Sequence, residues 1–334
     1  MADGAGTAYW SAARIRGHEL AVSGFPVTGL VDSRPLGSPI PESGSSASAF
    51  AIGMTTFPEA IGVGPDSTPR RSVLEAAEEA GMATGLVTTT HVVDATPAAF
   101  AAHVVTRDSM TTIARHMASS GVDVLLGDGA RTFDPDHRPD GRDLLGELAR
   151  THTIVRSAEA LDRARAEPPE RLVGFFGIDS IADPAVRRPS LAAMTTAALR
   201  VLDRDPDGFF LLVENEHTDH RGHDNADLET IVAEVMEVDR AVRAALAYRA
   251  ERPETLIVVA GDHETGGLTL HTGPDGYRAR WTTRGHTPEL VPIFAIGPGA
   301  DRFGGILSSA GVGRALFQAI GTELESPGSS PGAH

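Results

Sequence analysis

Short apolar runs alternate with amphipathic segments along most of the chain. Runs of strand length lie at residues 25–32, 84–90, 122–129, 209–213, 255–260 and 291–297. Apolar positions at helical spacing lie at residues 70–81, 189–203, 227–250 and 313–321. A further helix is expected to start at Pro97, since proline is tolerated in a first turn. Strands that alternate with helices predict an α/β fold with a buried, mostly parallel sheet.

The sharpest change from apolar to polar follows the run at 209–213. Glu214, Asp219 and His223 come directly after it, at the carboxyl end of a strand, where open α/β sheets hold their ligands. Asp219 and His223 are four residues apart, so one helical turn would bring both side chains to one face. A carboxylate and an imidazole placed in this way suit a divalent metal such as zinc. A solvated acidic loop with incidental histidines is the alternative for this stretch alone.

A second segment of the same kind favours the metal site. Residues 255–267 read TLIVVAGDHETGG, so Asp262 and His263 also follow an apolar strand and precede glycines. One such segment is common in proteins, but two in one chain point to a shared site at one edge of the sheet.

Composition narrows the possible partners. The chain has 334 residues, a formal net charge of −16 and no cysteine. The acidic balance argues against nucleic acid as a specific partner, because phosphate backbones require a basic surface. The lack of cysteine excludes disulfides, thiolate metal ligands and a cysteine nucleophile. No apolar run approaches the length of a membrane-spanning helix, and no signal peptide is visible.

These motifs, taken in chain order, resemble those of the alkaline phosphatase family. They are TTTHVVDATPAAFAAHVVTR at 88–107, the spacing of Glu214, Asp219 and His223, GDHETGG at 261–267 and GHT at 285–287. The resemblance extends from Asp3 to about Gly297. It implies a three-layer α/β sandwich with a large, mostly parallel central sheet flanked by helices. It also implies hydrolysis of small phosphate monoesters through a phosphoserine.

The resemblance implies two Zn²⁺ ions and one Mg²⁺ ion. The first zinc would bind Asp219, His223 and His286. The second would bind Asp3, Asp262 and His263, and the magnesium would bind Asp3, Thr96 and Glu214. Asp94 and His220 would surround the third site, and His220 would either reach phosphate through water or draw that site toward zinc.

Ser43 falls at the nucleophile position of the resemblance, and Arg107 falls where the family clamps phosphate. Ser43 lies among small residues ahead of an expected helix, where backbone N–H groups and the helix dipole favour a phosphoryl group. The segment departs from the family pattern in two places, with Glu42 where aspartate is usual and Ser48 where threonine is usual. A serine- and glycine-rich linker is the alternative interpretation, and Ser45 and Ser46 are fallback nucleophiles.

The start of the chain differs from the family pattern, in which an apolar strand precedes the aspartate that matches Asp3. Here only Met1 and Ala2 precede it, so either the true start lies upstream or the chain is a short form that lacks the first strand. We expect one catalytic domain over residues 1–321 and a disordered tail over 322–334. Only 22 residues separate His263 from His286, an interval that often builds the subunit interface in the family. A homodimer is therefore possible rather than expected.

Two other functions remain open. One is a phosphodiesterase or nucleotide pyrophosphatase on the same metal core. The other is an inactive metal-binding relative, which the missing strand, Glu42 and Ser48 would favour. Family members are usually periplasmic or secreted, but the absence of a visible signal peptide leaves the location undetermined.

Overall fold

The protein is an α/β sandwich of three layers in the computed structural model, which describes residues 1–179, 181, 183–273 and 276–324. The middle layer contains a five-stranded sheet in which every neighbouring pair is parallel. Its order is β4 (Thr153–Val155), β5 (Leu172–Phe175), β3 (Val124–Asp128), β2 (Ala83–His91) and β6 (Phe209–Glu214). The predicted fold class is confirmed.

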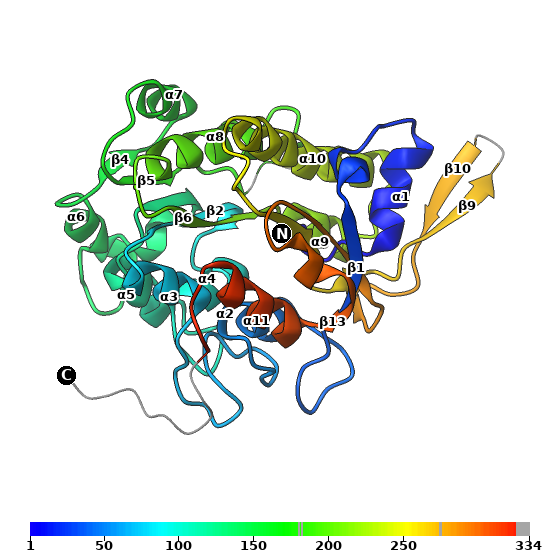
Figure 1. Cartoon of the computed structure of the whole chain (residues 1–334), viewed down its shortest axis with the longest axis horizontal. Helices are drawn as coiled ribbons and strands as arrows, with labels where there is room; N and C mark the ends of the chain where they lie inside the picture. Colours follow the sequence, from blue (N-terminus) through cyan, green and yellow to red (C-terminus); the bar gives the residue numbers. More distant parts are fainter. Residues whose placement is uncertain (180, 182, 274–275, 325–334) are drawn as a thin grey trace.

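Helices cover both faces of this sheet (Figure 1). One layer contains α7 (Ala158–Ala166), α8 (Leu191–Leu202) and α10 (Leu228–Glu251). The opposite layer contains α2 (Ser43–Ile52), α3 (Val73–Glu79), α4 (Ala95–Ala101), α5 (Met110–Ser119) and α11 (Ser309–Ala319). Since both faces are covered, β2 is apolar or uncharged almost throughout and buried from Ala83 to Thr90.

A second, mixed sheet of four strands continues the middle layer. Its order is β13 (Gly305–Ser308), β1 (Val27–Asp32), β12 (Val291–Ile296) and β7 (Ile257–Ala260). Strand β12 runs antiparallel to both of its neighbours. The smaller elements are α1 (Thr7–Ile15), α6 (Leu144–Leu148), α9 (His217–His223), β8 (Glu264–Thr265), β9 (Thr269–Gly273), β10 (Gly276–Arg280) and β11 (His286–Thr287).

The first residues of the chain lie between β6 and β7 and connect the two sheets. The Met1 ammonium group donates to the Val213 carbonyl at 2.7 Å, and the Ala2 N–H donates to the Ala260 carbonyl at 2.9 Å. Next to Met1, strands β6 and β7 border a cavity of about 610 Å³, which is lined partly by Phe210 and Val258.

Most predicted elements lie within a few residues of the observed ones, and α4 shows why the boundaries shift. It begins at Ala95 rather than Pro97, because Asp94 accepts a hydrogen bond from the Ala95 N–H and caps the helix. Of the predicted tail 322–334, residues 325–334 lie outside the described residues. Within the described part of the chain, no helix has the length and apolar character needed to cross a membrane.

Candidate active site

The candidate site lies at the carboxyl ends of β2, β6 and β7, where the N-terminal residues and the start of α2 meet them. Thr96 follows β2, Glu214 ends β6, and Asp262 follows β7. Asp3 is held beside them by its N–H, which donates to the Asn215 carbonyl at 3.2 Å, and is only 1 % exposed. The structure therefore brings side chains from distant parts of the chain to one edge of the sheet.

Asp219, His223 and His286 form the first group. The Nε2 atoms of the two histidines are 3.1 Å apart, and Asp219 oxygens lie 3.2 Å from His223 and 3.4 Å from His286. Each ring turns its other nitrogen to a backbone carbonyl, Arg284 for His223 and Pro41 for His286. Such bonds fix the tautomer and leave Nε2 available to a metal.

Asp3, Asp262 and His263 form the second group, with Ser43 beside it. His263 Nε2 lies 3.4 Å from an oxygen of each aspartate and 3.2 Å from Ser43 Oγ. Gly4 allows the N-terminal segment to lie close to Asp219. It has φ +65°, and an added Cβ would lie 2.8 Å from Asp219 Oδ1. Ser43 is the first residue of α2, so its hydroxyl stands at the N-terminal end of the helix.

Four buried oxygens in this region have no hydrogen-bond partner. They are Asp3 Oδ1, Asp262 Oδ2, Glu214 Oε1 and Thr96 Oγ1. Buried polar atoms are normally satisfied, and an orphaned one often marks the place of an ion. The donor chemistry fits divalent metals, because nitrogen and carboxylate sets suit zinc and all-oxygen sets suit magnesium.

The pKa values of the buried carboxyl groups also favour bound cations. Burial, together with the charges of Asp262 and Asp219, raises the pKa of Asp3 well above its usual value. Burial also raises the pKa of Glu214 to about 7. Although burial works against its charged form, hydrogen bonds from His223 and His286 hold the pKa of Asp219 well below its usual value. Divalent cations would favour the ionised form of all three carboxylates.

Arg107 is held beside the start of α2 by two carboxylates. Its Nη2 donates to Asp94 Oδ1 at 2.5 Å, and its Nη1 lies 3.6 Å from Glu42 Oε2. Glu42 in turn caps α2, because its carboxylate accepts the N–H groups of Gly44 and Ser45 at 2.7 and 2.6 Å. The guanidinium therefore lies within reach of a group bound at Ser43.

The hydroxyl groups of Ser45, Ser46 and Ser48 all form hydrogen bonds with the backbone. Ser45 Oγ donates to the Glu42 carbonyl and Ser46 Oγ to the Ser33 carbonyl, both at 3.3 Å. Ser48 Oγ donates to the Ala60 carbonyl and accepts the Gly62 N–H, at 2.7 and 2.9 Å. These bonds favour Ser43 as the nucleophile.

The contacts of His220 are with Glu216 and His217. Its Nε2 lies 3.2 Å from Glu216 Oε1, and its ring packs edge-on against His217. Thr265, for which no role was predicted, donates its hydroxyl to Asp219 Oδ1. Its place in the GDHETGG motif, two residues after His263, was the signal that could have indicated such a role.

Comparison with known proteins agrees with this geometry. A sequence model described as alkaline phosphatase matches residues 1–279. Alkaline phosphatase 3 of Bacillus subtilis is 28 % identical, over 84 % of this chain and 77 % of its own length. The tissue-nonspecific alkaline phosphatase of Gallus gallus is 30 % identical, over 100 % of this chain and 73 % of its own.

Solved structures of alkaline phosphatases have the same fold as this chain. The alkaline phosphatase from the Antarctic bacterium TAB5 superposes with a TM-score of 0.87 at 28 % identity, over 96 % of each chain. A substituted form of the TAB5 enzyme has Mg bound in its M3 site; it superposes with a TM-score of 0.85 at 28 % identity, over 97 % of this chain and 96 % of its own. This chain therefore belongs to the alkaline phosphatase family of phosphoric monoester hydrolases.

Proposed function

We propose that this chain hydrolyses phosphate monoesters through a phosphoserine at Ser43, within a site for two zinc ions and one magnesium ion. The observation that carries the proposal is the position of the Ser43 hydroxyl. It lies 3.2 Å from His263 Nε2, among buried carboxylates whose oxygens have no partner. The membership of the chain in the alkaline phosphatase family supports the reaction class.

The donor sets support three separate ion positions. Asp219, His223 and His286 offer ligand atoms within 4.8 Å of one another. In the second set, His263 Nε2 lies 3.4 Å from an oxygen of Asp3 and from one of Asp262. Both sets suit zinc. The oxygens of Asp3, Thr96 and Glu214 would hold magnesium, and Mg in the M3 site of the TAB5 relative supports that assignment. Bound in pairs, such cations lower the pKa of an attacking hydroxyl and stabilise both oxygens of an in-line displacement.

Ser43 would act as the nucleophile. Its Oγ forms a bond to phosphorus while the ester P–O bond breaks, and the alcohol leaves with a proton. A water molecule then attacks the phosphoserine, which releases inorganic phosphate and restores the Ser43 hydroxyl. Because Ser43 opens α2, the positive end of the helix dipole favours the negative phosphoryl group throughout.

Arg107 would hold the oxygens of the transferring group. A guanidinium can donate two parallel hydrogen bonds to a phosphoryl group, and the Asp94 and Glu42 carboxylates already fix its orientation. The Gly44 N–H is directed to the Glu42 carboxylate. The charge on the transferring group would therefore depend mainly on Arg107 among the protein's own donors.

Replacing the nucleophile tests the proposal directly. Ser43→Ala should lower kcat for an aryl phosphate by at least roughly 100-fold, because the covalent route is lost. Ser45→Ala is the matched control, since the Ser45 hydroxyl already donates to a carbonyl, and its kcat should change less than about threefold. Equal rates for Ser43→Ala and the parent enzyme would rule out the phosphoserine.

Substrate and metal dependence separate this function from the alternatives. An aryl phosphomonoester should be hydrolysed faster than the corresponding diester, and a chelator should abolish the rate until zinc and magnesium are returned. A faster rate with the diester would favour the phosphodiesterase. Folded, metal-loaded protein with no turnover of either ester would identify an inactive relative.

A further inference from the structure

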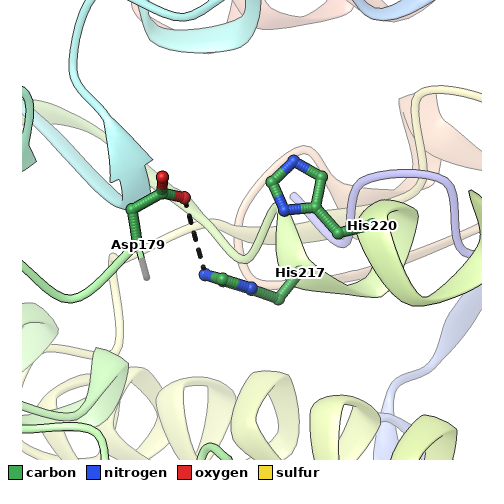
Figure 2. A group of neighbouring side chains, drawn as sticks. All are labelled: Asp179, His217 and His220. Carbon is green, nitrogen blue, oxygen red and sulfur yellow. Dashed lines mark ion pairs between the residues drawn. The ribbon is translucent and has the colours of Figure 1, made fainter. Parts of the chain in front are cut away.

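A second group of potential metal ligands lies outside the proposed catalytic site. It consists of Asp179, which follows β5, and of His217 and His220 on α9. Each side chain offers one ligand atom, and these atoms all lie within 4.8 Å of one another. Figure 2 shows the Asp179 carboxylate directed toward one end of the His217 ring, with the His220 ring beside His217.

Helix α9 carries residues of this group and also ligands of the proposed catalytic site. His217 and His220 are three residues apart, and Asp219 and His223 are four apart, so each pair shares one side of the helix. At about 100° per residue, the centres of the two pairs are roughly 110° apart around the helix axis. One short helix thus contributes ligands to two different places.

His217 is a buried imidazole that the protein satisfies only in part. It is 1 % exposed, and its Nδ1 has no hydrogen-bond partner. Its Nε2 lies 3.3 Å from the Thr89 carbonyl and 3.9 Å from Asp179 Oδ1, both long for a hydrogen bond. Since a buried polar group without a strong partner destabilises the fold, this ring indicates a ligand that completes it.

The other two side chains are already oriented by neighbours. His220 Nε2 lies 3.2 Å from Glu216 Oε1, and this contact leaves the other ring nitrogen available. Asp179 Oδ1 accepts the Thr90 hydroxyl at 3.1 Å, and Asp179 Oδ2 lies 3.6 Å from His91 Nε2. Around protein metal sites, the side chains that bind the metal are commonly oriented by hydrogen bonds to neighbouring groups, such as a carboxylate beside an imidazole or a hydroxyl beside a carboxylate.

We propose that Asp179, His217 and His220 bind a further zinc-type divalent cation. Two imidazoles and one carboxylate are a donor set that zinc accepts, with water in the remaining position. The His220 side chain is 40 % exposed, so a cation can reach the site from solvent. The bound ion would connect the segment after β5 to α9. It requires neither the nucleophile Ser43, nor Arg107, nor any ligand of the three proposed catalytic ions.

Anomalous diffraction at the zinc edge, on crystals of the whole protein grown with zinc and magnesium, tests the proposal. A peak should lie between the three side chains, apart from any peak at Asp219 or His263. Asp179→Asn and His217→Gln should each remove this peak and lower the zinc content by about one ion per chain. Asp179→Asn preserves the shape of a side chain that is 28 % exposed, so it retains the test if His217→Gln fails to fold.

Asp134→Asn is the matched control. Asp134 lies 3.5 Å from His137, and the two belong to none of the three-ligand groups among the described residues. The control should keep both the peak and the zinc content. The absence of a peak in the parent protein, or equal zinc content in the parent and both site variants, would overturn the proposal. The rate with an aryl phosphate reports separately on the catalytic function and should change less than about twofold in Asp179→Asn.

Discussion

Glu42 illustrates how one residue can depart from a family pattern and still serve the site. Its side chain is one methylene longer than the usual aspartate. In the structure it turns back onto α2, where its carboxylate accepts the N–H groups of Gly44 and Ser45, and also the Glu59 N–H at 2.9 Å. The same carboxylate stays 3.6 Å from Arg107. The extra length is thus taken up by the helix cap, and Ser43 keeps its place at the start of the helix.

Glu78 supports a prediction about pH at the residue scale. Burial raises its pKa to about 7. A carboxyl group with a raised pKa contributes stability at low pH, and that contribution is lost as the pH rises through the folded pKa. Glu78→Gln should therefore gain stability relative to the parent protein as the pH rises from about 5 to about 8. Urea unfolding at several pH values measures the difference.

The neighbouring Glu79 provides the control for this prediction. Its side chain is 62 % exposed and pairs with Arg71 on the surface, so Glu79→Gln should show no comparable change with pH. A constant difference between Glu78→Gln and the parent across the pH range would contradict the prediction. The Thr84 hydroxyl, which donates to Glu78 Oε1 at 2.8 Å, can donate to the glutamine oxygen as well.

At the scale of elements, the edges of β6 and β7 face each other across a cavity. Phe209, Phe210 and Leu211 of β6 are only partly buried, which is unusual for a strand in a covered parallel sheet. An extension of about six valine and isoleucine residues fused ahead of Met1 should enter this space as a strand, since much of the cavity lining, including Phe100 and Val312, is apolar. It should raise Tm by at least about 3 °C through apolar burial. Differential scanning calorimetry measures the shift.

A glycine and serine extension of the same length controls for the fusion itself. It offers no apolar surface and lacks strand propensity, so Tm should not rise. If the apolar extension shifts Tm no more than the control does, then the cavity does not accept a strand.

At the scale of the whole molecule, the proposed cations should contribute much of the stability. Buried carboxylates from distant parts of the chain lie together in the site, namely those of Asp3, Glu214 and Asp262. Removing the metals with a chelator should lower Tm, and a ligand at about 1,000 times its Kd stabilises a fold by about 4 kcal/mol. Returning zinc and magnesium should restore Tm. An unchanged Tm after complete metal removal would contradict the proposed sites.

The effect of the chelator should also depend on pH. In metal-free protein, burial raises the pKa of Asp3, and it raises that of Glu214 from 4.5 to about 7. The stability that the neutral forms provide is lost as the pH rises through this range. The free energy of unfolding of chelated protein should therefore fall with rising pH, and that of metal-loaded protein should fall less. Parallel profiles would indicate that the carboxylates do not hold the cations.

Much of the fold and of the site could be predicted from local patterns. The apolar runs located the strands, and the polar residues after them located Glu214, Asp219 and Asp262, because strand ends in α/β sheets are recognisable in the sequence alone. The partners of Glu42 and Gly44 could not be predicted, since they depend on how one side chain turns over the end of α2. The group of Asp179, His217 and His220 was missed for a similar reason. His217 and His220 are neighbours in the sequence, but Asp179 reaches them only through the order of strands in the sheet.

The sequence by itself determined which residue types are available and where each strand and helix lies, because hydrophobic periodicity, caps and turns act over short distances along the chain. Only the tertiary structure decided which side chains meet. Asp3 and His286 come from opposite ends of the chain, and their approach depends on sheet topology, on the entry of Met1 between β6 and β7, and on a glycine at position 4 that leaves room for Asp219. These are contacts between distant segments, and the free energy that fixes them comes from the packing of the whole domain.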